Sequence, residues 1–318
     1  MVQVRNHSID TLKLICALLV VFIHCSYPYK AEILPITDVA VPLFFCISGY
    51  FVCGAKRSLK RINRIVWIFI WSATLYLLKT EVYHLLSTDE MWIPSLHTIE
   101  NFVFFNDVAF SIHLWYLPAY IYVLIMAFLI DKYNIWKLSM GMIIPLLLVG
   151  VYIKYSISDV CPKEIEYYRN AYFCGLPYFL TGALIKNTPP RMHQYHTVLK
   201  VPLILTILGL FIMRYYLLGN SLLILVAREM NLLVLSVCIF FLTTICIQQE
   251  SNLLSKLGRN YSLYIYILHL ILMSICEMIA IHLPSVYNQV YMYFNPLCVF
   301  FLSIVVTYSL AKTQIIKL

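Results

Sequence analysis

Charged side chains are scarce in this sequence of 318 residues. Only 12% of the residues are Asp, Glu, Lys or Arg, whereas 62% are hydrophobic and the mean hydropathy is +0.82. A soluble domain of ordinary composition has about 25% charged and about 45–50% apolar residues. The shortage of charge therefore excludes an ordinary soluble domain and indicates a polytopic membrane protein.

Other features are also missing from the sequence. No long Ser/Gly linker, charge block or internal repeat divides it, so we expect one integral membrane domain over 1–318. The ten cysteines show no CxxC or Cys/His spacing, and we expect no metal site. The first apolar run lacks a small-residue cleavage site and is expected to be retained as a span. Short alternating segments typical of a β-barrel are absent too.

Long apolar runs are what the sequence contains instead. Runs of about 17–25 residues can cross a bilayer as helices, and they predict an all-α, polytopic membrane helical bundle. About ten transmembrane helices are expected on this criterion. Their predicted ranges are 11–28, 39–55, 62–80, 114–130, 136–156, 171–187, 198–219, 229–248, 261–282 and 293–312.

The placement of Lys and Arg predicts the orientation. If both termini are cytoplasmic, roughly twice as many basic residues fall on the inner side as on the outer side. The net charge of +8 is then mainly an insertion signal. Because the basic residues are scattered over short loops, we expect membrane lipids and no nucleic acid among the partners.

Two ionisable residues, Lys13 and His24, lie inside the first apolar run. Their spacing places both on one helix face, about 16 Å apart along the axis. Ionisable groups at membrane depth are costly and are functional candidates. The alternative interpretation is a snorkelling lysine with a hydrogen-bonded core histidine.

Basic residues also gather at the predicted inner mouth. Arg61 and Arg64 are at i, i+3 and share a helix face, and with Lys13 they could form a cup for the phosphates of a nucleotide-like donor. Anchoring to lipid headgroups is an equal alternative. Asp10 is expected to pair with a cation of this mouth such as Lys13 or Arg64, and Arg259 belongs to the same side.

Five further residues are candidates for the acceptor side or a channel. Ser48 precedes Gly49 in the second span, where small residues permit close helix packing. His269 is expected about 12 Å inside the inner end of its span, and a core histidine is the alternative. His113, Trp115 and Tyr116 open the fourth span at the outer face, where an aromatic interfacial belt is the alternative.

Together these segments resemble the acyltransferase 3 family of integral membrane acyltransferases. The matches occur in the family order and cover nearly the whole chain. They are Ile-Asp-x-Leu-Lys with Lys-x10-His (Lys13, His24), Phe-Phe-x-Ile-Ser-Gly-Tyr (44–50), Arg-x-x-Arg (61–64), His-x-Trp-Tyr-Leu (113–117) and Tyr-Ser-Leu-Tyr-x-Tyr-x-Leu-His (261–269). Lysine at 13 replaces the commoner arginine, which keeps the charge but loses the bidentate fork.

The resemblance implies a function. Such proteins move an acyl group, often acetyl, from cytoplasmic acyl-CoA to an acceptor outside, commonly a glycan hydroxyl. We therefore expect acetyl-CoA as co-substrate, no bound cofactor, an extracytoplasmic or lipid-linked glycan as acceptor, and the bacterial cytoplasmic (inner) membrane as location. Some relatives carry a fused extracytoplasmic esterase-like domain. This sequence reaches Leu318 without such an esterase-like domain. We therefore expect either direct transfer to the acceptor or a separate glycan-assembly partner protein.

The residues can be assigned roles on this basis. His24 is the candidate general base, since its unperturbed pKa lies near neutrality, and Asp38 is the candidate that orients it. Two other classes stay open: a transporter or flippase for a polar solute, and a scaffold or sensor in glycan assembly. The donor side would comprise Lys13, Arg61, Arg64, Asp10 and Arg259, and the acceptor side or channel His113, Trp115, Tyr116, Ser48 and His269.

Overall fold

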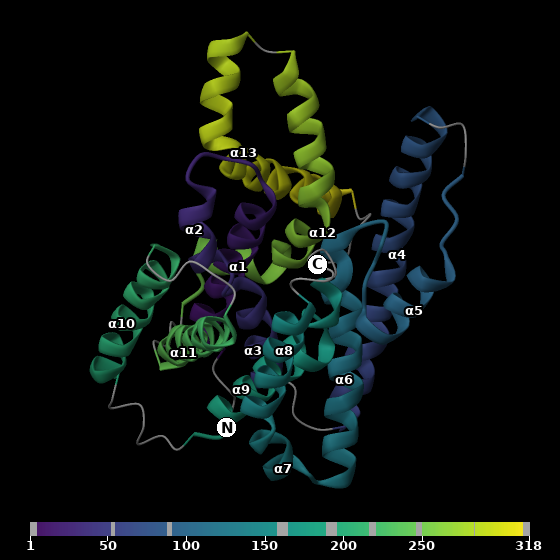
Figure 1. The fold of residues 1–318 in the computed structure, drawn as a ribbon. Coiled ribbons are helices and arrows are strands. Elements are labelled where there is room, and N and C mark those ends of the chain that lie inside the picture. The colour runs from purple at the N-terminus through teal and green to yellow at the C-terminus, as the bar shows by residue number, and fades with distance from the viewer. Residues whose placement is uncertain are drawn as a thin grey trace. The chain divides into compact units, whose positions relative to one another are not determined.

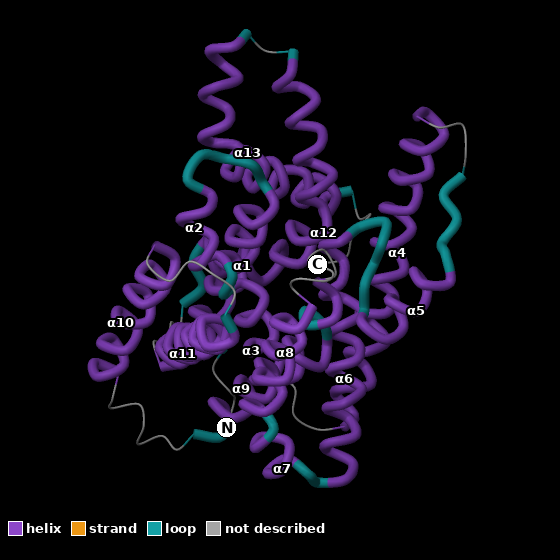
Figure 2. The backbone as a smooth tube through the Cα atoms, viewed as in Figure 1, coloured by secondary structure: helices purple, strands orange, loops and turns teal. Residues whose placement is uncertain are grey.

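The computed structural model describes residues 5–51, 55–87, 91–157, 165–188, 196–215, 221–245, 250–282 and 284–313. Regular structure in these ranges is helical throughout, without a strand, as the sequence predicts (Figure 2). The helices are α1 His7–His24, α2 Lys30–Thr37, α3 Ala40–Phe51, α4 Ala55–Ser87, α5 Leu96–Phe105, η1 Ile112–Trp115, α6 Tyr116–Tyr133, α7 Trp136–Gly141, α8 Ile143–Ile157, η2 Ile165–Tyr167, η3 Ala171–Gly175, α9 Leu176–Lys186, α10 His196–Tyr215, α11 Leu222–Ile245, α12 Leu253–Ile281 and α13 Ser285–Lys312.

The helices form two compact units, each assembled from separate stretches of chain. Unit 1 comprises Met1–Phe44, Pro189–Leu218 and Asn231–Leu318, and unit 2 comprises Phe45–Thr188 and Gly219–Met230. Helices α3 and α11 each contribute residues to both. The single domain expected over 1–318 stays a prediction.

Seven helical stretches in the described part of the chain are long and apolar enough to cross a membrane. They are His7–His24, Lys30–Phe51, Leu59–Ser87, Ile112–Tyr133, Leu222–Ile245, Leu253–Ile281 and Tyr287–Lys312.

Each of these seven stretches overlaps one of the predicted spans. The other three predicted spans, 136–156, 171–187 and 198–219, coincide with shorter elements. The range 136–156 overlaps two helices, since α7 ends at Gly141 and α8 begins at Ile143. The range 171–187 contains α9, which has 11 residues. The range 198–219 overlaps α10, whose apolar stretch is Lys200–Gly209. The total of about ten spans and the cytoplasmic termini therefore stay predictions.

Unit 1 is organised around α1, which packs most extensively against α12, while α12 and α13 form an antiparallel pair (Figure 1). A Cβ atom placed on Gly258 of α12 would lie 1.9 Å from the carbonyl oxygen of Asp10, so only glycine permits this approach of the two backbones. The buried core of the unit consists of Leu14, Ala17, Val21, Cys25, Tyr261, Ile265, Val299 and Phe300.

Helices α1 and α12 run parallel, and both begin with an asparagine cap. Asn6 accepts a hydrogen bond from the Ser8 N–H, and Asn252 forms a capping box with Ser255. The direction follows from two contacts, because Asp10 touches Gly258 near the start and His24 lies beside His269 further along. Helix α12 therefore lies against α1 both at the level of Asp10 and at the level of His24.

Unit 2 holds α4 alongside α6 and α3 against α9. A Cβ on Gly49 would lie 1.8 Å from the carbonyl oxygen of Phe179, and one on Gly182 would lie 1.9 Å from that of Cys46. The two glycines thus let α3 and α9 touch backbone to backbone. The packing interpretation of the Ser48–Gly49 pair is confirmed for Gly49.

Candidate active site

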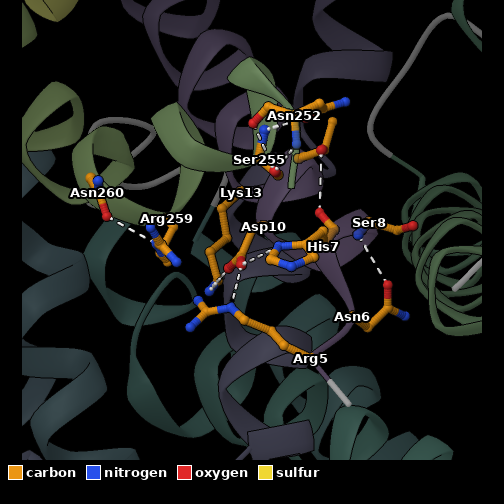
Figure 3. Close-up of polar contacts among 11 residues, drawn as sticks. Arg5, Asn6, His7, Ser8, Asp10, Lys13, Asn252, Ser255, Arg259 and Asn260 are labelled. Carbon is orange, nitrogen blue, oxygen red and sulfur yellow. Dashed lines mark hydrogen bonds and ion pairs between the residues drawn. The ribbon is translucent and has the colours of Figure 1, made fainter. Parts of the chain in front are cut away.

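Asp10 is the centre of an ion-pair cluster at the start of α1 (Figure 3). The residue is 2% exposed. Lys13 Nζ lies 2.8 Å from Asp10 Oδ1, Arg5 Nε lies 2.8 Å from Oδ2, and His7 Nδ1 lies 3.9 Å from Oδ2. A buried carboxylate needs such partners, because removing a charge from water is costly. The predicted ion pair between Asp10 and Lys13 is therefore present, and these four residues are named here the Asp10 cluster.

The Asp10 cluster presents more positive than negative charge. Arg5 binds Asp10 through Nε, so its two terminal nitrogens extend away from the carboxylate (Figure 3), and its side chain is 50% exposed. Arg259 directly follows Gly258, whose backbone touches Asp10, and its Nε donates to Asn260 Oδ1 at 3.1 Å. Guanidinium forks held in this way suit the bidentate recognition of phosphate.

His24 ends α1 and lies beside His269 of α12. The ring centroids are 5.1 Å apart and the ring planes are inclined by 44°. His24 is half-buried, whereas His269 is fully buried, with Nδ1 at 2.7 Å from the Tyr266 carbonyl oxygen and 3.2 Å from that of Ile265. Within unit 1 the structure thus brings His269, expected on the acceptor side or in a channel, to the candidate base.

Asp38, the candidate for orienting His24, is an exposed residue just after α2. Its backbone N–H donates to the Leu34 carbonyl oxygen at 3.0 Å, which closes the helix. Its side-chain role toward His24 stays a prediction.

Arg61 and Arg64 lie near the start of α4 in unit 2. Arg61 is half-buried, and its Nη1 donates to Tyr120 Oη of α6 at 3.4 Å, whereas Arg64 is exposed. Lys13 belongs to unit 1, so the joint cup predicted for Lys13 and the two arginines stays a prediction.

His113 of η1 and Tyr116, the first residue of α6, are both buried in unit 2. His113 is 2% exposed, its Nδ1 is 2.9 Å from Ser111 Oγ, and its ring lies 4.7 Å from that of Tyr76. Tyr116 is stacked on Tyr120 with ring centroids 5.8 Å apart. These contacts give both side chains packing roles, and their part in acceptor binding stays a prediction.

Trp115 lines a small cleft in unit 2, together with apolar residues (Phe105, Ile112 and Ile165) and charged ones (Asp107, Glu166 and Arg169). The Arg169 guanidinium lies over the Trp115 ring, 5.3 Å from its centroid, and Asp107 and Glu166 are the acidic residues of the cleft. Glu166 accepts a hydrogen bond from Asn101 Nδ2 at 3.3 Å. Burial raises the pKa of Asp107, while the Arg169 charge opposes that shift. Ser48 lies elsewhere in unit 2, buried in α3.

Sequence reasoning missed Arg5 as a partner of Asp10, and it missed Glu229. Glu229 lies inside the apolar stretch Leu222–Ile245, and Tyr178 Oη donates to its Oε1 at 2.9 Å. A carboxylate within an apolar run was the available signal. Because the predicted span began at residue 229, Glu229 was interpreted as a residue at the end of a span and not as a carboxylate within it.

Comparisons with known proteins match this chain to one protein family and to curated proteins that are more than twice as long as the matched region. The profile of the acyltransferase 3 family, described as an acyltransferase domain, matches residues 6–311. An amino-acid racemase of Enterococcus faecalis is 25% identical over 315 residues, which cover 90% of this chain and 43% of the relative. A serine/alanine racemase of Enterococcus gallinarum is 27% identical over 292 residues, which cover 83% and 40%. The chain thus spans less than half the length of these relatives, and no solved structure matches it.

Proposed function

This chain belongs to the acyltransferase 3 family, and on that premise we propose that it transfers an acyl group from cytoplasmic acyl-CoA to a hydroxyl of an extracytoplasmic or lipid-linked glycan. Acetyl is the proposed group and acetyl-CoA the proposed donor. The apolar helices support an integral membrane protein, for which we propose the bacterial cytoplasmic membrane.

The observation that carries the proposal is the distribution of charge along α1. One end of the helix holds the Asp10 cluster, with Lys13 and Arg5 anchored on one buried carboxylate. The other end holds His24 beside His269. Lys13 and His24 are about 16 Å apart along the axis, a span that suits a pantetheine arm reaching from a phosphate site to a reactive centre.

The chemistry assigned to these groups is a single acyl transfer. His24 removes the proton of the acceptor hydroxyl while the hydroxyl oxygen attacks the thioester carbon. The new ester C–O bond forms, the C–S bond breaks, and the CoA thiolate leaves and takes the proton from His24. Arg5, Lys13 and Arg259 hold the donor phosphates during this step. Arg61 and Arg64 are proposed as further donor ligands.

The names of the relatives favour a second candidate. Both are called racemases of amino acids, and one is named for serine and alanine. A membrane domain matching less than half of such proteins could handle a small amino acid as transported solute instead of a glycan as acyl acceptor.

Sealed vesicles with the purified protein in known orientation separate these candidates. Labelled acetyl-CoA is supplied on one side and a set of glycans on the other, and the product is analysed for label. Parallel vesicles receive labelled serine or alanine without acetyl-CoA. Vesicles containing His24→Ala at matched protein amount are the control in both arms.

The proposed function predicts labelled, acetylated acceptor with wild-type protein and little with His24→Ala. It predicts no net movement of unmodified amino acid. Movement of labelled serine or alanine across the membrane, without any acyl transfer, would refute the acyltransferase function and support the transporter. Acetylation only when donor and acceptor share one side would refute transfer across the membrane while leaving the reaction class intact.

A further inference from the structure

The contacts of His269 define its tautomer. Its Nδ1 lies 2.7 Å and 3.2 Å from two backbone carbonyl oxygens of its own helix, those of Tyr266 and Ile265. A carbonyl oxygen can only accept, so Nδ1 carries the hydrogen. In the neutral ring Nε2 is then the acceptor nitrogen, and full burial favours that neutral form because burying a charge is costly.

The neighbour of this ring is the candidate base. His24 and His269 lie with ring centroids 5.1 Å apart, on parallel helices that are held in close approach at the Gly258–Asp10 contact. His24 is half-buried at the end of α1, so part of its side chain is accessible. A general base works best when a second group accepts its remaining N–H and fixes its tautomer.

In the structure no hydrogen bond joins Nε2 of His269 to His24, and catalytic hydrogen bonds often align only when substrate is bound. We propose that His269 is the positioning residue of His24: when the acceptor hydroxyl binds, His269 Nε2 accepts the His24 ring N–H, so that the other His24 nitrogen presents its lone pair to the hydroxyl. This inference rests on the proposed function, since it assigns His269 a part in the same acyl transfer. The sequence placed His269 on the acceptor side or in a channel and made Asp38 the candidate for orienting His24. The proposal assigns the orienting role to His269 instead.

The pairing has a chemical consequence. When His24 takes the hydroxyl proton, the positive charge stays on His24, because the Nδ1 hydrogen of His269 is committed to the helix carbonyls. The lone pair of His269 stabilises that imidazolium through a charge-assisted hydrogen bond. The proton then goes to the CoA thiolate, and both rings return to their starting tautomers.

Two substitutions separate this role from a packing role. His269→Asn can still donate from its side-chain amide to a helix carbonyl but has nothing at the position of Nε2. His269→Gln reaches the position of Nε2 with an amide oxygen that can accept the His24 N–H. His282→Asn, at the exposed end of α12, is the matched control.

The first measurement is steady-state acyl transfer by each variant, with protein amount and melting temperature recorded. His269→Asn should lower kcat by about 10- to 100-fold, less than the ~10⁴-fold known for a charged orienting partner, with the KM for acyl-CoA unchanged. His269→Gln should recover part of that loss, and His282→Asn should match wild type. His24→Ala combined with His269→Asn should be no slower than His24→Ala alone, because the two residues act as a unit.

The second measurement does not depend on acyl transfer. Carbethoxylation of His24 by diethylpyrocarbonate, followed by mass spectrometry, reports the nucleophilicity of its outward nitrogen. We expect labelling several-fold slower in His269→Asn than in wild type and restored in His269→Gln.

The possible outcomes separate the positioning role of His269 from the acyl-transfer function. Wild-type kcat and labelling rate in His269→Asn, or equal losses in the Asn and Gln variants, would overturn the positioning role. Absence of transfer by the wild-type protein with every donor and acceptor would overturn the proposed function. The labelling rates would then still decide whether His269 orients His24.

Discussion

Replacing Gly258 with alanine tests whether the contact of α1 with α12 sets the geometry of the site. The added Cβ would lie 1.9 Å from the Asp10 carbonyl oxygen, 2.9 Å from its carbonyl carbon and 3.1 Å from Leu14 Cβ. Real Cβ atoms essentially never lie closer than 3.0 Å to another such heavy atom. The two helices must therefore separate by at least ~1.1 Å at this level, because the obstacle is backbone and cannot rotate away.

The magnitude follows from two opposing effects. Alanine inside a helix gains about 0.5–1 kcal/mol over glycine through backbone entropy. Overpacking that moves backbone typically costs about 1–3 kcal/mol and occasionally more. We expect the second effect to prevail, with a net loss of about 1–2 kcal/mol in the free energy of unfolding and a fall of a few degrees in Tm.

Gly141→Ala is the matched control, because a Cβ at Gly141 at the end of α7 has no atom within 4 Å. Thermal unfolding of both variants in detergent, followed by tryptophan fluorescence, compares them directly. We expect Gly141→Ala to be neutral or slightly stabilising. Acyl transfer by Gly258→Ala should fall as well, because a 1 Å displacement can lower a rate by about 10²-fold.

Equal Tm values and equal activities for Gly258→Ala and Gly141→Ala would refute the reasoning. That result would mean that α1 and α12 separate without consequence for either the Asp10 cluster or the His24–His269 pair. A lower Tm with undiminished activity would keep the packing argument and remove its link to catalysis.

Three other predictions concern single side chains. His24→Ala should lower acyl transfer by about 10²–10⁴-fold at unchanged acyl-CoA affinity; near wild-type turnover at matched abundance would remove His24 from the mechanism. Asp10→Asn should weaken acyl-CoA binding in a titration and lower the free energy of unfolding by about 1–3 kcal/mol, since Lys13 and Arg5 lose their shared partner; an unaltered Kd would argue against the Asp10 cluster as a donor site. Arg64→Ala should weaken acyl-CoA binding and Arg64→Lys should restore it only in part, because the fork is lost; the same affinity in all three proteins would favour lipid anchoring.

The class of the protein could be derived from composition and run length. Membrane helices must be long and apolar, since lipid offers no hydrogen bonds to the backbone, and seven of the predicted ranges meet that standard in the structure. The three shorter elements show the limit of the criterion. Run length alone did not predict that α7 and α8 are separate helices or that α9 has only 11 residues.

The donor end of α1 was also accessible to local reasoning. The Asp10–Lys13 ion pair follows from i, i+3 spacing on one helix, where neighbouring side chains meet by geometry. Arg5 was harder to assign, because it precedes the helix and its side chain returns to Asp10 from an extended segment. Helical spacing rules do not apply to such a residue.

The sequence by itself determined that this is an all-helical membrane protein of the acyltransferase 3 type, with Lys13 and His24 on one helix, because hydropathy and helical periodicity are local properties. Only the tertiary structure decided that His269, 245 positions after His24, is the imidazole beside it. The physical reason is that the pair depends on how α12 docks on α1. That docking depends on the missing side chain of Gly258, whose close approach to Asp10 no periodicity reveals.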